Sequence, residues 1–398
     1  MKPMKIVYAT DTYWPRINGV TVSISSYKEQ MEKRGHEVHV LSPMYPGRVN
    51  IRDKEKNIHR FSSYKILFTS HDEDRLVYPW NKGEAFRVLD SIKPDIIHQQ
   101  TEFSMGIMAF KYAKTHDVPV VLTSHTYFEE YAKLYFPFIP EFLLRAYVRN
   151  RAYRFYNKVD FMITPTIRMK DVIKSYKVTT PIEVIPTGLS GDDFNGIDKK
   201  RDKSNSIFAN QYPQIKGKKI LLYTGRIGGE KNIYFLFNVM MKLIPKHKDL
   251  MFLLAGDGPQ RRELEGFVKA KGIDKNVLFL GYVDRGVIKY LYSLADIFIF
   301  ASKTESQGLV TIEAMMCHTP VVALGIMGTK DVMNGDNGGY MVDENIDQFA
   351  EKVDHLLSDK KLYKKKSDEA YKYSQNWTLD KTAKKMEEVY RAIIALRK

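Results

Sequence analysis

Short apolar runs recur along the whole chain, separated by stretches with helical spacing. Nearly every position in these runs is apolar, which is typical of strands buried on both faces of a parallel sheet. In the first half they occupy residues 5–9, 36–41, 95–98, 118–125, 159–165 and 182–188. In the second half they occupy residues 219–226, 250–255, 277–283, 296–300, 320–323 and 338–343. Strands that alternate with helices in both halves predict an α/β protein with two doubly wound domains.

The length of 398 residues also suits two domains. Residues 190–217 are polar, charged and poor in large apolar side chains, which is typical of a linker. We therefore expect a first domain over residues 1–190, a linker over 191–217 and a second domain over 218–375. Residues 376–398 form a further helical segment.

Composition narrows the class of protein. A net charge of +15 favours polyanionic partners, either nucleic acid or anionic lipid. The single cysteine, Cys317, excludes an intrachain disulfide and indicates a reducing, cytoplasmic location. We find no signal-peptide core, no apolar run of about 18 residues and no zinc-ligand spacing. We therefore expect neither secretion nor a spanning helix.

The most informative stretch is residues 301–323, which read as loop, helix and strand after the apolar run at 296–300. Glu305 lies in the loop and Glu313 in the helix, with seven residues between them. The helix begins near Gly308, where free N–H groups of residues such as Leu309 and Val310 favour an anion. A ligand with a phosphate at this helix end and hydroxyls bound by the two carboxylates would be a nucleotide sugar. The alternative is that both are solvated glutamates.

Cations follow the first strand of the second domain. Arg226 and Lys231 lie on either side of the pair Gly228–Gly229, at a junction between strand and helix. Two cations beside a freely accessible backbone can hold a diphosphate. An ordinary basic turn is the alternative.

The first domain offers two further candidates. Gly19 lies between a strand and a helix, an arrangement that suits phosphate, although the other glycines of the dinucleotide fingerprint are missing. His125 ends a strand, where ligands of open α/β sheets gather. An ordinary turn and a structural histidine are the respective alternatives.

Aromatic and basic residues are interleaved between residues 127 and 158. Such a mixture suits a membrane interface, although the arginines do not share one helical face. An ordinary basic surface helix is the alternative, and no nucleic-acid-binding motif is present. The acceptor or membrane candidates are Tyr13, Tyr127, Tyr131, Phe136, Phe138, Arg145 and Arg149. The Asp-x-Asp sequence at 72–74 reads as a solvated loop, so we expect no metal site.

The pattern Ser-x-x-Glu, seven residues, Glu-Ala-Met, then Thr-Pro-Val-Val-Ala resembles the motif of retaining GT-B glycosyltransferases; His318 stands where that family often has Gly. The resemblance implies two Rossmann-like domains facing across a cleft, with the C-terminal helix packed on the first. It implies that Glu305 contacts the donor sugar and Glu313 the ribose. It further implies that Arg226 and Lys231 grip the diphosphate, without metal or other cofactor, and that the product is α-linked.

The same resemblance assigns three further contacts. His125 would contact the sugar and support the reacting carbon, and Gly19 would approach the donor diphosphate. The backbone of Tyr282 and Val283 would meet the base.

Residues 125–131, 11–15 and 19–24 resemble bacterial diacylglycerol glucosyltransferases. This implies a hexosyltransferase that transfers sugar from UDP-glucose or UDP-galactose to diacylglycerol. It also implies a peripheral protein that binds the anionic inner face of the cell membrane and does not bind nucleic acid. Three alternatives stay open: a saccharide or polyprenyl-linked acceptor, a non-transferring sugar-nucleotide epimerase, and a nucleic-acid-binding protein.

Overall fold

The computed structural model describes residues 2–45, 56–66, 74–126, 128–129, 139–194, 197, 207–305, 307–333, 335 and 337–397. The chain divides into two compact units. Unit 1 comprises Met1–Gly188 and Leu379–Lys398, and unit 2 comprises Leu189–Thr378. None of the helices in the described ranges is long and apolar enough to cross a membrane.

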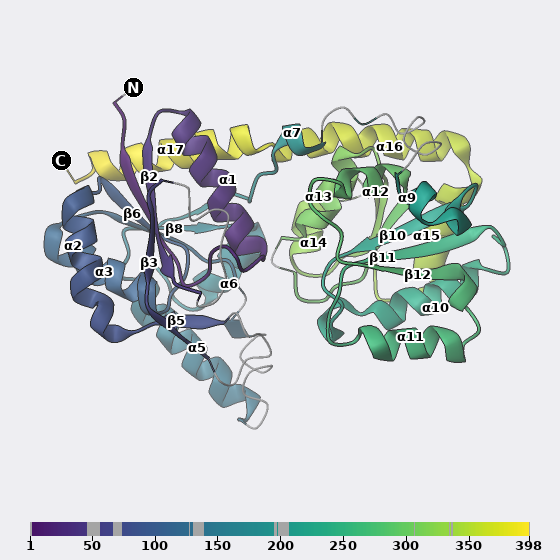
Figure 1. Cartoon of the computed structure of the whole chain (residues 1–398), viewed down its shortest axis with the longest axis horizontal. Helices are drawn as coiled ribbons and strands as arrows, with labels where there is room; N and C mark the ends of the chain where they lie inside the picture. The colour runs from purple at the N-terminus through teal and green to yellow at the C-terminus, as the bar shows by residue number, and fades with distance from the viewer. Residues whose placement is uncertain are drawn as a thin grey trace. The chain divides into compact units, whose positions relative to one another are not determined.

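Unit 1 is built on a sheet with strand order β3-β2-β1-β6-β7-β8-β9, whose neighbours all pair in parallel. Its strands are β1 (Lys5–Ala9), β2 (Glu37–Pro43), β3 (Ile58–Phe61), β6 (Ile96–Gln99), β7 (Val120–Thr123), β8 (Phe161–Thr164) and β9 (Ile182–Val184). A separate antiparallel pair joins β4 (Ser63–Lys65) to β5 (Arg75–Val77). The longer helices are α1 (Gly19–Lys33), α2 (Lys82–Ile92), α3 (Ser104–His116), α5 (Glu141–Tyr156), α6 (Ile167–Ser175) and α17 (Leu379–Ala395). Helix α3 packs against β6, and α2 lies beside α3 (Figure 1).

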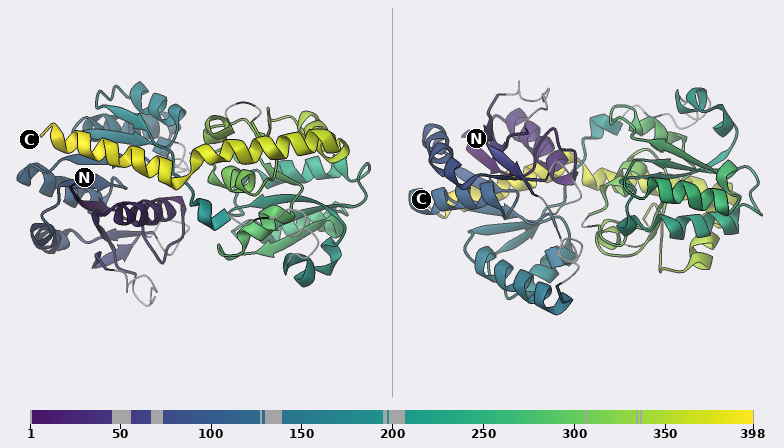
Figure 2. Two further views of the ribbon diagram at one scale, coloured as in Figure 1. Left: turned by 90° about the horizontal axis from the view of Figure 1, so that it is seen from above. Right: turned by 60° about the horizontal axis from the view of Figure 1, so that its bottom comes forward.

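The C-terminal helix α17 is part of unit 1 and packs against α1, so both chain termini lie in this unit (Figure 2). Its apolar residues recur every three or four positions, as in a helix with one buried face. These residues pack with Ile6 and Tyr8 of β1 and Ile24 of α1 in one core. They are Leu379, Ala383, Met386, Tyr390 and Ile393. At the edge of this contact, Arg34 forms an ion pair with Glu387, and Nε2 of His36 lies 3.2 Å from Oε1 of the same carboxylate.

Unit 2 contains a second parallel sheet, with strand order β12-β11-β10-β13-β14-β15. Its strands are β10 (Lys219–Thr224), β11 (Leu250–Ala255), β12 (Val277–Gly281), β13 (Ile297–Phe300), β14 (Val321–Leu324) and β15 (Gly339–Val342). Its α-helices are α7 (Gly191–Phe194), α9 (Ile207–Gln211), α10 (Ile233–Leu243), α11 (Arg261–Ala270), α12 (Ile288–Leu294), α13 (Leu309–Met316), α14 (Gly328–Met333), α15 (Ile346–Ser358) and α16 (Lys360–Ser374).

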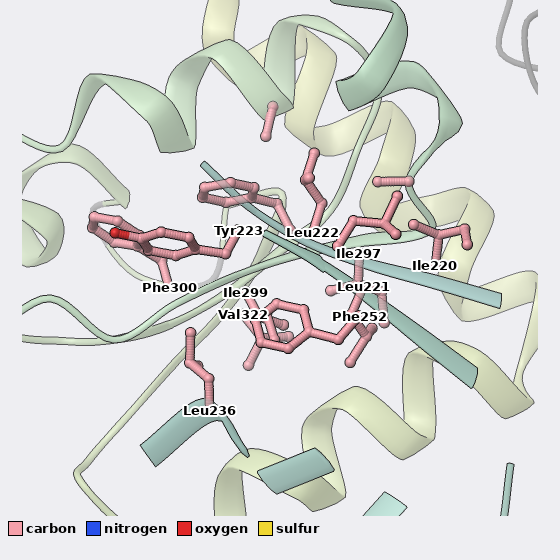
Figure 3. Close-up of a cluster of buried hydrophobic side chains, with 14 of the residues drawn as sticks. Ile220, Leu221, Leu222, Tyr223, Leu236, Phe252, Ile297, Ile299, Phe300 and Val322 are labelled. Carbon is pink, nitrogen blue, oxygen red and sulfur yellow. The ribbon is translucent and has the colours of Figure 1, made fainter. Parts of the chain in front are cut away.

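The core of unit 2 lies on both faces of its sheet. Alternate residues of β10 point to opposite faces, and all from Ile220 to Tyr223 are fully buried (Figure 3). The rings of Tyr223 and Phe300, from neighbouring strands, are nearly parallel, with centroids 6.1 Å apart. Burial on both faces explains why these strands read as continuous apolar runs.

Both sheets have a topological switch point. In unit 2 the chain leaves β10 toward β11 but leaves β13 toward β14, so the loops after these neighbouring strands diverge. In unit 1 the same reversal separates β1 from β6. Ligands of doubly wound sheets bind in the crevice that such a reversal creates at the carboxyl ends of the strands. The prediction of two doubly wound α/β domains is confirmed.

Candidate active site

The switch point of unit 2 brings together Lys231 and Glu305, which are 74 positions apart in sequence. Lys231 ends the short 3-10 helix between β10 and α10, and Glu305 lies in the loop between β13 and α13. The ammonium of Lys231 donates a hydrogen bond to Oε1 of Glu305, and their side chains are 16% and 21% exposed. A cation and a carboxylate thus meet in the crevice, with solvent still reaching both.

The two loops that carry this pair are tied together through Glu230. Its backbone oxygen accepts a hydrogen bond from the N–H of Lys303, at 3.1 Å. Its side chain holds Arg226, whose Nη2 lies 2.6 Å from Oε1 of Glu230 and whose side chain is 39% exposed. Arg226 and Lys231 are therefore fixed in one loop, each paired with a carboxylate of the same unit, where a diphosphate could replace those partners.

The N-terminus of α13 lies in the same loop as Glu305. Gly308, which caps the helix, has φ 72° and ψ 47°, a left-handed conformation that strains residues with a Cβ. Its carbonyl accepts hydrogen bonds from the N–H and the hydroxyl of Thr311, at 3.0 and 2.7 Å. The preceding N–H groups, of Leu309 and Val310, belong to the first turn, whose donors have no intrahelical acceptor. This end of the helix favours a negative charge.

Glu313 lies apart from the Lys231–Glu305 pair and is 5% exposed. Its Oε2 accepts a hydrogen bond from the hydroxyl of Tyr292 at 2.7 Å, and its Oε1 lies 3.1 Å from Nη2 of Arg285. Burial and the nearby Glu313 raise the pKa of Tyr292 well above its usual value, so the phenol keeps its proton. Since Tyr292 donates to Glu313, the hydroxyl of Thr224 donates to Tyr292, at 2.7 Å.

These contacts constrain the ribose-binding role expected for Glu313. Both of its oxygens already have partners within unit 2, and the carboxylate raises the pKa of Arg285. Arg285 is the partner that could leave, because its side chain is 43% exposed. Sequence reasoning missed Arg285 and Tyr292: Asp284-Arg-Gly286 has the composition of any surface turn, and Tyr292 lies among apolar residues of a helix.

Tyr282 and Val283 follow β12, which is the edge strand of the sheet. The strand ends at Gly281, whose φ is 70°. Tyr282 is 66% exposed, and Val283 packs against the core of unit 2. The backbone contact to a base that the sequence suggests here stays a prediction.

In unit 1, His125 follows β7 and is largely buried. Its Nε2 lies 2.8 Å from Oε1 of Gln100; because this amide oxygen can only accept, Nε2 carries the proton. Burial lowers the pKa of His125 to about 4, so the ring is neutral at pH 7. The ring can therefore contact a ligand as a neutral polar group. It lines a small pocket with Ser23, Tyr27, His98, Gln100, Thr123, Ile163, Pro165, Ile185, Thr187 and Met386.

Gly19 begins α1, directly after Asn18, whose side chain accepts a hydrogen bond from the N–H of Thr21 at 2.9 Å. A Cβ on Gly19 would meet no atom within 4 Å. Atoms of unit 1 therefore do not crowd Gly19 on the side where a side chain would stand. Tyr13, in contrast, is fully buried, and the guanidinium carbon of Arg60 lies 5.4 Å from its ring centroid. A membrane contact by Tyr13 would require its side chain to leave this position.

The expected acceptor segment is described in part. Tyr127, Tyr131, Phe136 and Phe138 lie outside the described residues. In α5, Arg145 and Arg149 both form ion pairs with Glu129, at 3.5 and 2.7 Å.

Helix α5 has two distinct faces. Leu144, Ala152 and Tyr156 are buried, at positions spaced by multiples of four. Phe142, Leu143 and Tyr147, in contrast, are 71%, 50% and 64% exposed. The helix thus presents apolar side chains to solvent near its arginines.

Comparison with known proteins bears on both units. A family model described as Glycosyl transferases group 1 matches residues 205–373, and one described as Glycosyltransferase Family 4 matches residues 17–192. The Streptococcus pneumoniae alpha-monoglucosyldiacylglycerol synthase is 30% identical over 334 residues, covering 81% of this chain and 71% of that protein. The Acholeplasma laidlawii protein of the same name is 28% identical over 337 residues, covering 80% of each.

Among solved structures, Anabaena Alr3699/HepE in complex with UDP-glucose matches 98% of this chain and 100% of its own, with a TM-score of 0.76 and 16% identity. This likeness extends to the whole fold, and the prediction of a GT-B fold is confirmed. The chain therefore belongs to the group 1 glycosyltransferases and is an enzyme of that family.

Proposed function

We propose that this glycosyltransferase moves a hexose, glucose or galactose, from a UDP-sugar to a membrane lipid, diacylglycerol. The observation that carries the proposal is the meeting of Lys231 and Glu305 beside the N-terminus of α13. A cation and a helix N-terminus suit a diphosphate, and a carboxylate that solvent still reaches suits sugar hydroxyls. The names of the two synthases support the lipid acceptor, and the UDP-glucose complex of HepE supports the donor.

Departure of the nucleotide is the chemical problem that the donor site has to solve. As the bond between the anomeric carbon and the diphosphate breaks, negative charge grows on the leaving oxygen. Lys231, Arg226 and the first N–H groups of α13 are fixed before the reaction, so they can stabilise this charge with little reorganisation. We propose that they do so without a metal ion. We also propose that Glu305 stabilises the positive charge that develops on the sugar.

The acceptor side is proposed to be unit 1, with α5 at the membrane surface. Exposed Phe142, Leu143 and Tyr147 can enter the headgroup region, and the flanking arginines can meet anionic lipid. His125, neutral at pH 7, is proposed to contact the sugar. The product is proposed to retain the α configuration of the donor, which is the family behaviour that the sequence motif implies.

A donor-release assay tests the proposal. Purified protein is incubated with UDP-glucose or UDP-galactose and EDTA, with and without diacylglycerol in anionic mixed micelles. UDP release that requires lipid, together with an α-glycolipid product, is the expected result. UDP release that does not depend on diacylglycerol would favour the alternative acceptor class, a saccharide or polyprenyl-linked saccharide, and sugar isomerisation without an acceptor would favour an epimerase.

Two variants test the site itself. Lys231→Ala and Glu305→Gln should each lower transfer at least about 100-fold, which is the usual effect of removing one preorganised charge partner. Lys242→Ala is a matched control, because Lys242 forms an exposed ion pair with Asp347 elsewhere in unit 2. Wild-type transfer in either site variant would contradict the assignment.

A further inference from the structure

Thr329 is a buried hydroxyl with no partner. It lies in the first turn of α14, after β14, and its side chain has 0% exposure. Its Oγ1 makes no hydrogen bond within the described part of the chain. A buried hydroxyl without a partner costs folding free energy, so it calls for an explanation.

The hydroxyl lies at the N-terminus of α13. If Gly308 carried a Cβ, the nearest atom to it would be Oγ1 of Thr329, at 3.4 Å, and Cβ of Glu305 would be 4.0 Å away. The N–H of Gly328 donates to the backbone oxygen of Glu305 at 2.8 Å, which fixes the start of α14 to this loop. The unpartnered hydroxyl, the helix N-terminus and the stem of Glu305 therefore share one small region of unit 2.

Neighbouring threonines show what a structural hydroxyl looks like in this unit. Thr311 donates to the carbonyl of Gly308 at 2.7 Å, and Thr319 donates to the carbonyl of Tyr292 at 2.7 Å. Thr329 makes no such bond, although a valine of the same shape would fill the space without the polar atom. Within the described loop, Oγ1 of Thr304, beside Glu305, also lacks a partner.

We propose that Thr329 binds the donor hexose and contributes to the choice of sugar. A threonine hydroxyl donates one hydrogen bond and accepts others, so it can match a sugar hydroxyl held by Glu305. This inference rests on the proposed donor site. A site built to hydrogen-bond a substrate hydroxyl discriminates against sugars that place it differently, because its polar group is then left unpaired.

The test compares the affinities of UDP, UDP-glucose and UDP-galactose for wild type, Thr329→Val and Thr329→Ser by titration calorimetry. Thr329→Val should bind the preferred UDP-hexose about 3- to 10-fold more weakly, the usual effect of losing one neutral hydrogen bond, and should bind UDP unchanged. Its Tm should equal or exceed that of wild type, because the unpartnered hydroxyl is gone. Thr329→Ser should restore the affinity.

A matched control is Thr382→Val, which removes a buried hydroxyl that does have an acceptor, the carbonyl of Leu379 at 3.1 Å. It should lower Tm and leave the ratio of UDP-hexose to UDP affinity unchanged. Unchanged UDP-hexose affinity in Thr329→Val, equal weakening of UDP, or a lowered Tm would each overturn the role of Thr329. Failure of the wild type to bind any UDP-hexose would instead overturn the proposed function.

Discussion

Glu102 is a buried acid whose protonation should make the stability of unit 1 depend on pH. It follows β6 and is 7% exposed, and its Oε1 accepts a hydrogen bond from the hydroxyl of Tyr156 at 2.5 Å. Its backbone oxygen accepts from Nη2 of Arg151 at 2.8 Å. Tyr156 and Arg151 belong to α5, so Glu102 anchors this helix. Burial raises the pKa of the carboxyl to about 7, although Tyr156 and Arg151 act in the opposite direction.

The sign and size of the effect follow from linkage. Because the pKa of Glu102 rises from 4.5 on folding to about 7, the folded state holds the proton more tightly than the unfolded state. The resulting stability is fully present below pH 4.5 and is lost as pH rises through about 7. The difference of about 2.5 units corresponds to about 3 kcal/mol in the free energy of unfolding.

Glu102→Gln removes the titration while keeping a side-chain oxygen that can accept from Tyr156. Wild type should therefore lose up to about 3 kcal/mol relative to the variant between pH 4.5 and 8. The measurement is the urea dependence of amide hydrogen exchange in unit 1 peptides at several pH values. Hydrogen exchange reports the unfolding of unit 1 separately from that of unit 2, whereas a fluorescence transition would combine the two.

The control is Glu351→Gln, since the Glu351 side chain is 55% exposed and lies in unit 2. It should leave the pH dependence of unit 1 unchanged. If the stability difference between wild type and Glu102→Gln stays constant from pH 4.5 to 8, burial does not raise the pKa of Glu102 and the reasoning is refuted.

Three further predictions concern other parts of unit 1. Phe142→Ser should weaken binding to anionic vesicles about 10-fold or more, because an aromatic ring that becomes buried in the lipid contributes about 1.5–3 kcal/mol to binding. Unchanged cosedimentation with the vesicles would contradict this. Burial lowers the pKa of His98 from 6.5 to about 3, so the stability that the neutral ring contributes is present above pH 6.5 and is lost as pH falls. His98→Asn should therefore make the urea midpoint depend less on pH below 6.5; an unaltered dependence would contradict this. Gly106→Ala should lower Tm markedly, because its Cβ would lie 2.0 Å from the carbonyl oxygen of Thr101; a wild-type Tm would exclude that crowding.

The strands that precede the candidate site were predictable because they are buried on both faces. The apolar run at 296–300 became β13, and the run at 219–226 became β10 with the start of its loop. We predicted no strand or helix between residues 48 and 92, yet this segment contains β3, β4, β5 and α2. Strands β4 and β5 have three residues each and are partly exposed, so no period could be read from them.

His318 illustrates how local chemistry can replace a glycine. It adopts φ 58°, a conformation that costs a residue with a Cβ free energy relative to glycine. Its ring stacks on Tyr371 of α16, with centroids 4.0 Å apart and planes 9° apart. The sequence showed the departure from the family pattern, but the stacking partner lies 53 positions away and follows no local spacing.

The site residues were predictable in kind more than in their contacts. Strand ends, glycines and charges indicated Lys231, Glu305 and Gly308, since parallel strands bring their carboxyl ends to one edge. No motif or spacing along the chain indicated Arg285 or Thr329. Arg285 matters because it contacts Glu313 of α13, and Thr329 because it lies beside Gly308 at the start of that helix.

The two glutamates of the motif also differ in a way that seven intervening residues do not reveal. Glu305 precedes α13 and, like its partner Lys231, is partly exposed to solvent. Glu313, in the second turn of α13, contacts Tyr292 and Arg285. In both cases the carboxylate is paired with a cation of its own unit. A donor would therefore exchange one set of charge partners for another, so no charge would have to lie unpaired in the crevice before binding. Such exchange keeps the charged side chains in place for the reaction and avoids the large penalty of a buried charge without a partner.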